Sequence, residues 1–171
     1  MKRLNIALVA HDARKQELIE WCRHNAQFLS EHNLFATGTT GKLIKDMFMQ
    51  LDNSDNYAGG ITEMIRYYDY KVTALLSGPL GGDQQIGAMI AEGKIDVLIF
   101  FCDNLITQGH QQDVGALSRL ASLYNIAFAT NRTTADLIVT SHLLIDNSYD
   151  RVIPSVISRY TNRFNQEKVF S

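Results

Sequence analysis

The feature that most restricts the fold of this sequence is the alternation of short apolar runs with segments of helical periodicity. The clearest run, 95–101, is apolar except for Asp96 and is therefore typical of a strand buried on both faces. Further strands are predicted at 4–10, 33–36, 72–76 and 126–129, and helices at 17–29, 39–51, 82–91, 114–124 and 134–144. This alternation predicts an α/β fold, a doubly wound parallel sheet of five strands with helices on both faces.

Polar or glycine-rich residues follow each of the predicted strands. In a doubly wound sheet the carboxyl ends of the parallel strands lie along one edge, where ligands bind. The residues expected at that edge are His11 and Asp12, 37–41, 77–83, Asp103, and 130–131. Their convergence predicts a functional site at this edge.

The segment TGTTG at 37–41 opens a predicted helix directly after a strand. Backbone N–H groups at a helix N-terminus, together with three hydroxyls, suit an oxyanion such as phosphate. The alternative is that Thr39 or Thr40 only caps the helix. The GxxxxGK[ST] spacing is absent, which argues against a nucleoside triphosphate.

The segment SGPLGGD at 77–83 places Asp83 at the start of the next helix. Asp83 is either an N-cap or an acid–base group. The second interpretation is favoured by further titratable residues expected near the same edge, which are His11, Asp12, Asp103, His110 and Asp113. Four of these, His11, Asp12, Asp103 and His110, are of types that ligate zinc. No metal is expected, because neither an HExxH motif nor paired cysteines are present.

The charge balance excludes several classes of partner. Sixteen Lys and Arg against eighteen Asp and Glu give a net charge of −2, which argues against binding to nucleic acid or to a membrane surface. No apolar stretch approaches the roughly 20 residues that a membrane span needs. Cys22 and Cys102 are too few for a disulfide scaffold. We therefore expect a cytoplasmic protein with free thiols.

Several motifs resemble the methylglyoxal synthase family. They are IALVAHD at 6–12 with Lys15, ATGTTG at 36–41, LSGPLGGDQQIGAMIAEGKIDVLIFF at 76–101, ATN at 129–131 and TAD at 134–136. The resemblance implies a flavodoxin-like fold and a lyase that converts dihydroxyacetone phosphate to methylglyoxal and inorganic phosphate, a bypass of glycolysis. It also implies no metal or organic cofactor, inhibition by phosphate, and a homo-oligomer, typically a hexamer.

The resemblance also implies roles for individual residues. Asp83 is the general base, His11 and His110 contact the reacting end of the substrate, and Asp12, Asp103 and Asp113 are supporting acids. The residues that hold the phosphoryl group are Lys15, Thr37, Gly38, Thr39, Thr40, Ser77 and Gly78. Arg163, in preference to Arg159, is expected to reach the phosphate site of a neighbouring subunit.

The sequence departs from the family in three places, one of which is an extended tail beyond Arg163. We expect a single domain over residues 1–171, in which residues 49–70 are an insertion relative to the family. Within the insertion, a loop is expected at 52–60 and a short helix at 61–70. Cys102 stands where the family commonly has tryptophan. Two alternatives to the lyase stay open, a non-catalytic regulatory module that binds a phosphate ligand and an isomerase of triose phosphates.

Overall fold

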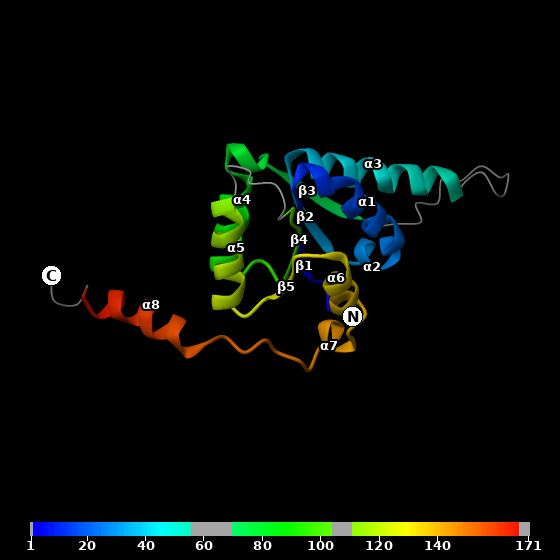
Figure 1. Ribbon diagram of the computed structural model, residues 1–171. Helices are drawn as coiled ribbons and strands as arrows, with labels where there is room; N and C mark the ends of the chain where they lie inside the picture. The colour runs from blue at the N-terminus through cyan, green and yellow to red at the C-terminus, as the bar shows by residue number, and fades with distance from the viewer. Residues whose placement is uncertain (1, 56–69, 104–110, 168–171) are drawn as a thin grey trace.

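A five-stranded parallel sheet forms the centre of the protein in this computed structural model (Figure 1). The structure describes residues 2–55, 70–103 and 111–167. The strands are β1 (Asn5–Ala10), β2 (Asn33–Thr37), β3 (Lys71–Leu75), β4 (Val97–Phe101) and β5 (Ala127–Ala129). Their order is β3-β2-β1-β4-β5, and every neighbouring pair is parallel. The predicted α/β class with five parallel strands is confirmed.

Helices cover both faces of the sheet because its central strands are apolar on both sides. Ile6 and Leu8 of β1 belong to one core cluster, and Ala7 and Val9 belong to the other. The first cluster is completed by α1 (Lys15–His24), α2 (Ala26–Ser30), α3 (Gly38–Asp55) and α6 (Arg132–Val139). The second is completed by α4 (Gly82–Ala91) and α5 (Gln111–Leu123). The sheet is therefore doubly wound.

The strand order reverses direction at β1. This strand pairs with β2 on one side and with β4 on the other. In doubly wound sheets, ligands bind outside the carboxyl ends of the strands at such a point. The order 3-2-1-4-5 matches the dinucleotide-binding sheets, whereas flavodoxin has the order 2-1-3-4-5. The likeness to flavodoxin is therefore one of class rather than of strand order.

Two predicted helices are divided in the structure, and a third extends into a predicted loop. The helix expected at 17–29 is interrupted at Asn25, which separates α1 from α2. The helix expected at 134–144 is divided by extended backbone at Ser141, after which α7 (His142–Ile145) begins. The loop prediction is wrong for residues 52–55, where α3 continues because no Gly or Pro stops it. Residues 56–69, with most of the short helix expected at 61–70, lie outside the described residues.

The C-terminal segment ends in α8 (Ser155–Glu167), a helix that was not predicted and that projects from the body of the protein (Figure 1). Two side chains tie the start of this segment to the body. Arg151 Nη1 donates to the Ile95 carbonyl over 3.1 Å, and Asn125 Nδ2 donates to the Val152 carbonyl over 3.0 Å. Beyond these bonds the segment exposes apolar side chains, among them Val152 and Tyr160.

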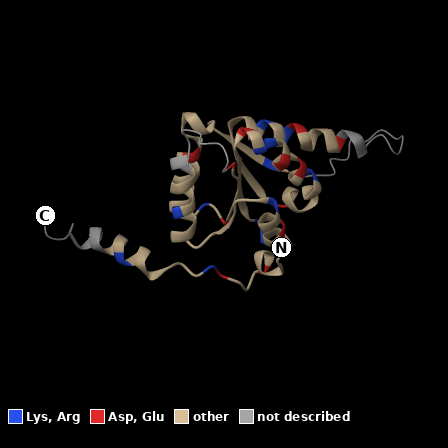
Figure 2. Ribbon diagram, in the orientation of Figure 1, with Lys and Arg blue, Asp and Glu red and all other residues tan. Residues whose placement is uncertain are grey.

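Basic and acidic side chains are interspersed along α1 and α3, as Figure 2 shows. Within residues 2–55, 70–103 and 111–167, no helix has the length and apolar character needed to cross a bilayer.

Candidate active site

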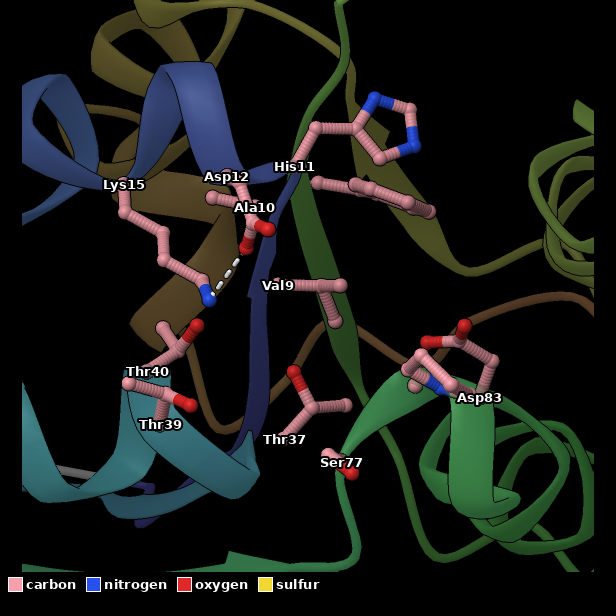
Figure 3. A pocket seen from close by; sticks show the side chains of 13 residues that line it. Val9, Ala10, His11, Asp12, Lys15, Thr37, Thr39, Thr40, Ser77 and Asp83 are labelled. Carbon is pink, nitrogen blue, oxygen red and sulfur yellow. Dashed lines mark ion pairs between the residues drawn. The ribbon is translucent and has the colours of Figure 1, made fainter. Parts of the chain in front are cut away.

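A cavity of about 330 Å³ lies at the carboxyl ends of the central strands. The residues that line it are Val9, Ala10, His11, Asp12, Lys15, Thr37, Thr39, Thr40, Ser77, Gly78, Pro79, Asp83 and Phe100. Figure 3 shows Lys15, Thr39 and Thr40 on one side of the view, and Asp83 on the other. The predicted position of the site at this sheet edge agrees with the cavity.

One side of the cavity presents a cation and hydroxyls. Lys15, in the first turn of α1, forms an ion pair of 2.5 Å with the exposed carboxylate of Asp12. Thr39 and Thr40 lie in the first turn of α3, whose amide N–H groups have no earlier helical carbonyl to donate to. Thr40 is 1% exposed, and its Oγ1 has no hydrogen-bond partner among the residues that the structure describes. A buried hydroxyl without a partner is costly, so this side of the cavity is built to receive an acceptor.

The other side presents the carboxyl group of Asp83. This residue lies in the first turn of α4 and is 8% exposed. Two glycines make room for it. A Cβ on Gly78 would lie 3.0 Å from Asp83 Oδ2, and a Cβ on Gly82 would collide with the Leu76 carbonyl oxygen. A side chain at position 78 would therefore crowd the Asp83 carboxyl, and position 82 requires glycine because the loop backbone passes so close to it.

His11 follows β1 and is held by the backbone after β4. The Asp103 N–H donates to His11 Nδ1 over 2.8 Å. Because Nδ1 accepts this bond, the proton of the neutral ring is on Nε2. The ring also packs edge-on against Phe100, with centroids 5.1 Å apart. His11 is thus oriented as a hydrogen-bond donor through Nε2.

The structure brings together most of the predicted site residues. Nine of them line the cavity, namely His11, Asp12, Lys15, Thr37, Thr39, Thr40, Ser77, Gly78 and Asp83. Gly38 lies beside the cavity, and its N–H donates to the Leu76 carbonyl over 3.1 Å. Asp103 meets the site through its backbone bond to His11. His110 lies outside the described residues, and only the helical backbone of Asp113 and Arg163 is described, in α5 and α8.

Three lining residues were not predicted, which are Val9, Ala10 and Phe100, whereas Pro79 lies in the segment 77–83 that was expected at this edge. All three are apolar residues of β1 and β4, so their sequence signal is that of core strands. The one sequence signal that could have identified them as site residues is their position near the ends of these two strands, shortly before polar residues. They form the apolar wall between the two polar sides of the cavity.

Cys102 lies directly after β4 and is buried. Burial raises the pKa of its thiol to about 11, so the thiol is protonated at neutral pH and is a poor nucleophile. Within the described ranges, no three His, Cys, Asp or Glu side chains are grouped in a way that could hold a metal ion.

The fold and the cavity define a doubly wound α/β protein whose strand-end pocket combines a cation and hydroxyls with a carboxyl and an imidazole. Residues 17–130 match the model of the MGS-like domain. The chain is 51% identical over 144 residues to the methylglyoxal synthase of Proteus mirabilis, covering 84% of this chain and 82% of that one. It is 46% identical over 149 residues to the methylglyoxal synthase of Pseudoalteromonas atlantica, covering 87% and 96%.

A crystal structure of methylglyoxal synthase from Elizabethkingia anophelis is similar to this one, with a TM-score of 0.70 and 41% identity. The match covers 89% of this chain and 86% of that one. The chain therefore belongs to the MGS-like family, together with these methylglyoxal synthases.

Proposed function

We propose that this protein is a lyase that converts dihydroxyacetone phosphate to methylglyoxal and inorganic phosphate. The observation that carries the proposal is one cavity with the Asp83 carboxyl on one side and, on the other, Lys15 and Thr40, which together with the first turn of α3 are called the cradle here (Figure 3). The names of the relatives support the same reaction. All atoms of the substrate pass into the two products, so the reaction needs no oxidant, reductant or added water.

The cradle is proposed to hold the phosphoryl group. The Thr40 hydroxyl, the first-turn N–H groups of α3 and the Lys15 ammonium are donors to the same region. Hydrogen bonds between such groups and a dianion are charge-assisted and therefore strong. Thr37, Gly38, Thr39, Ser77 and Gly78 complete the proposed binding set. Inorganic phosphate would occupy the same cradle and inhibit the reaction.

The carboxyl side is proposed to carry out the proton transfer. Asp83 removes a proton from the hydroxymethyl carbon beside the ketone, and the electron pair of that C–H bond forms the enediolate. His11 donates from Nε2 to the developing oxyanion, with His110 as a second contact. The double bond of the enediolate then shifts to the carbon that carries the phosphate, the C–O bond breaks with its electron pair leaving on the phosphate, and the hydroxyl carbon becomes the aldehyde as its O–H proton is released. The resulting enol takes up a proton at its terminal carbon and becomes methylglyoxal. Asp12, Asp103 and Asp113 are proposed as supporting acids.

We further propose a cytoplasmic homo-oligomer, a hexamer, in which Arg163 enters the phosphate site of a neighbouring subunit. The projection of α8 from the body supports this arrangement (Figure 1). Mixing two inactive variants, Asp83→Asn and Arg163→Ala, tests it. If the two residues act from different subunits, mixed oligomers regain activity because some sites receive an intact copy of both. Mixed oligomers without activity would contradict the arrangement.

The chain is proposed to be one domain, residues 1–171, with an insertion at 49–70. Replacing residues 56–69 by a short connection should leave phosphate binding and turnover in place. Loss of folding would indicate that the segment contributes to the core or to a subunit interface.

One assay tests the proposed reaction. The protein is incubated with dihydroxyacetone phosphate, and free phosphate, methylglyoxal and glyceraldehyde phosphate are measured. Equal amounts of phosphate and methylglyoxal are expected. Glyceraldehyde phosphate would indicate an isomerase instead. Tight binding of the substrate without any product would indicate the regulatory module.

A further inference from the structure

Leu76, the residue directly after β3, joins the two sides of the cavity. Its carbonyl accepts from the N–H of Gly38 over 3.1 Å, at the start of α3. Its own N–H donates to Oε1 of Gln85 over 2.8 Å, on α4. The residues that follow it, Ser77 and Gly78, line the cavity. The orientation of the Leu76 peptide groups therefore determines where these two lining residues lie.

The Gln85 side chain is the contact that holds the Leu76 N–H. The parallel ladder between β2 and β3 ends at the pair Thr37 and Leu75, so Leu76 lies beyond it. Leu76 is also half exposed, and water would replace a lost partner of its N–H. The backbone of Gln85 is held in α4, where its N–H donates to the Gly81 carbonyl over 3.0 Å, and its exposed side chain reaches Leu76 from there. Gln85 thus ties the end of β3 to the helix that carries Asp83.

We propose that Gln85 is a positioning residue for the phosphate side of the cavity, which it sets through the Leu76 N–H and the adjoining Ser77 and Gly78. The inference rests on the proposed function, because it assigns Gln85 to phosphate binding in that reaction. Asp83 is carried by the first turn of α4, whereas Ser77 and Gly78 follow Leu76 directly. Loss of the Gln85 contact therefore acts first on these two residues and reaches the Asp83 carboxyl only through its packing against Gly78. Loss of the Gln85 contact should therefore affect binding of the phosphoryl group far more than the proton transfer.

The variant Gln85→Met keeps the length of the side chain and removes the acceptor. We expect the KM for dihydroxyacetone phosphate and the inhibition constant for inorganic phosphate to rise together, by roughly 2- to 10-fold, the range that corresponds to the loss of one neutral hydrogen bond. The value of kcat should change by less than about threefold. A purely structural role would lower the Tm instead and leave the ratio of KM to kcat unchanged.

Gln50→Met is the matched control. Gln50 also uses Oε1 as an acceptor on a helix surface, from Arg23 Nη2 over 3.1 Å, and it does not line the cavity. The rescue variant is Gln85→Glu, which keeps an acceptor oxygen. Both Gln85 variants are compared with wild type at the same high ionic strength, which screens the added charge of glutamate. Under these conditions the phosphate affinity of Gln85→Glu should be close to that of wild type, whereas the affinity of Gln85→Met should stay low.

Hydrogen exchange provides a readout that does not depend on turnover. Backbone amides in the peptide 71–82 should exchange faster in Gln85→Met than in Gln50→Met. If exchange and KM are the same in both variants while the wild type turns over the substrate, only the inference about Gln85 is overturned. If the wild type neither turns over the substrate nor binds inorganic phosphate, the proposed function is overturned and this inference with it.

Discussion

Replacing Thr40 by valine should stabilise the empty protein and weaken phosphate binding at the same time. Valine has the shape of threonine and places a methyl group where the hydroxyl was. Thr40 Oγ1 is buried and has no hydrogen-bond partner within the described part of the chain, so the folded protein bears the cost of removing this hydroxyl from water. That cost is about 1–3 kcal/mol for a buried polar group. The valine variant avoids it.

The two effects have opposite signs and can be measured separately. A gain of about 1–2 kcal/mol in the free energy of unfolding corresponds to a rise in Tm of roughly 2–8 °C for a chain of this size. A hydrogen bond to a charged group contributes about 1.5–3 kcal/mol, so the Kd for inorganic phosphate should rise by roughly 10- to 150-fold. Thermal unfolding without phosphate measures the first effect, and calorimetric titration with phosphate measures the second.

Thr39→Val is the control for the stability effect. Thr39 is exposed in the same helical turn, so its hydroxyl is already solvated and its removal should not raise the Tm. A Thr40→Val variant that is less stable than wild type without phosphate, or that binds phosphate with unchanged affinity, would refute the reasoning.

Three further outcomes are expected. Burial lowers the pKa of His32, whose ring packs against Phe28. Because the unfolded chain then binds a proton more readily than the folded protein, the free energy of unfolding should fall as the pH drops below about 6.5. Urea titrations between pH 7 and 5.5 should show a weaker pH dependence in His32→Asn than in wild type. Lys15→Met should raise the KM for substrate and the inhibition constant for phosphate together, by roughly 10- to 150-fold, and a change in only one of them would contradict a shared cradle. Turnover should survive dialysis against a chelator, and a loss restored by zinc or magnesium would overturn the metal-free reaction.

The sheet and the gathering of polar residues at one of its edges followed from local patterns in the sequence. The run at 95–101 is apolar on both faces because β4 is covered by helices on both sides. A strand buried in this way can be recognised from its nearly continuous apolar residues. The polar residues after β1, β2 and β3 meet because parallel strands place their carboxyl ends at one edge. Both inferences need only the periodicity of single segments.

Other features depend on contacts that no segment contains. The break at Asn25 and the projecting helix α8 have no strong stop or start signal of their own. The interaction between Leu76 and Gln85 joins a strand end to a helix nine positions later, and sequence alone does not show which glutamine of the GGDQQ motif turns toward it. The orphaned hydroxyl of Thr40 likewise becomes visible only when its surroundings are known.

The most direct test of the proposed reaction is proton removal by Asp83→Asn. Asparagine is nearly isosteric with aspartate and cannot accept the proton. The substrate is labelled with deuterium at the hydroxymethyl carbon, and loss of deuterium to the solvent is measured, with the phosphate-induced rise in Tm as a check on folding and binding. We expect intact phosphate binding, with deuterium loss and kcat both reduced by about 10²- to 10⁴-fold. Deuterium loss at close to the wild-type rate would show that Asp83 is not the base.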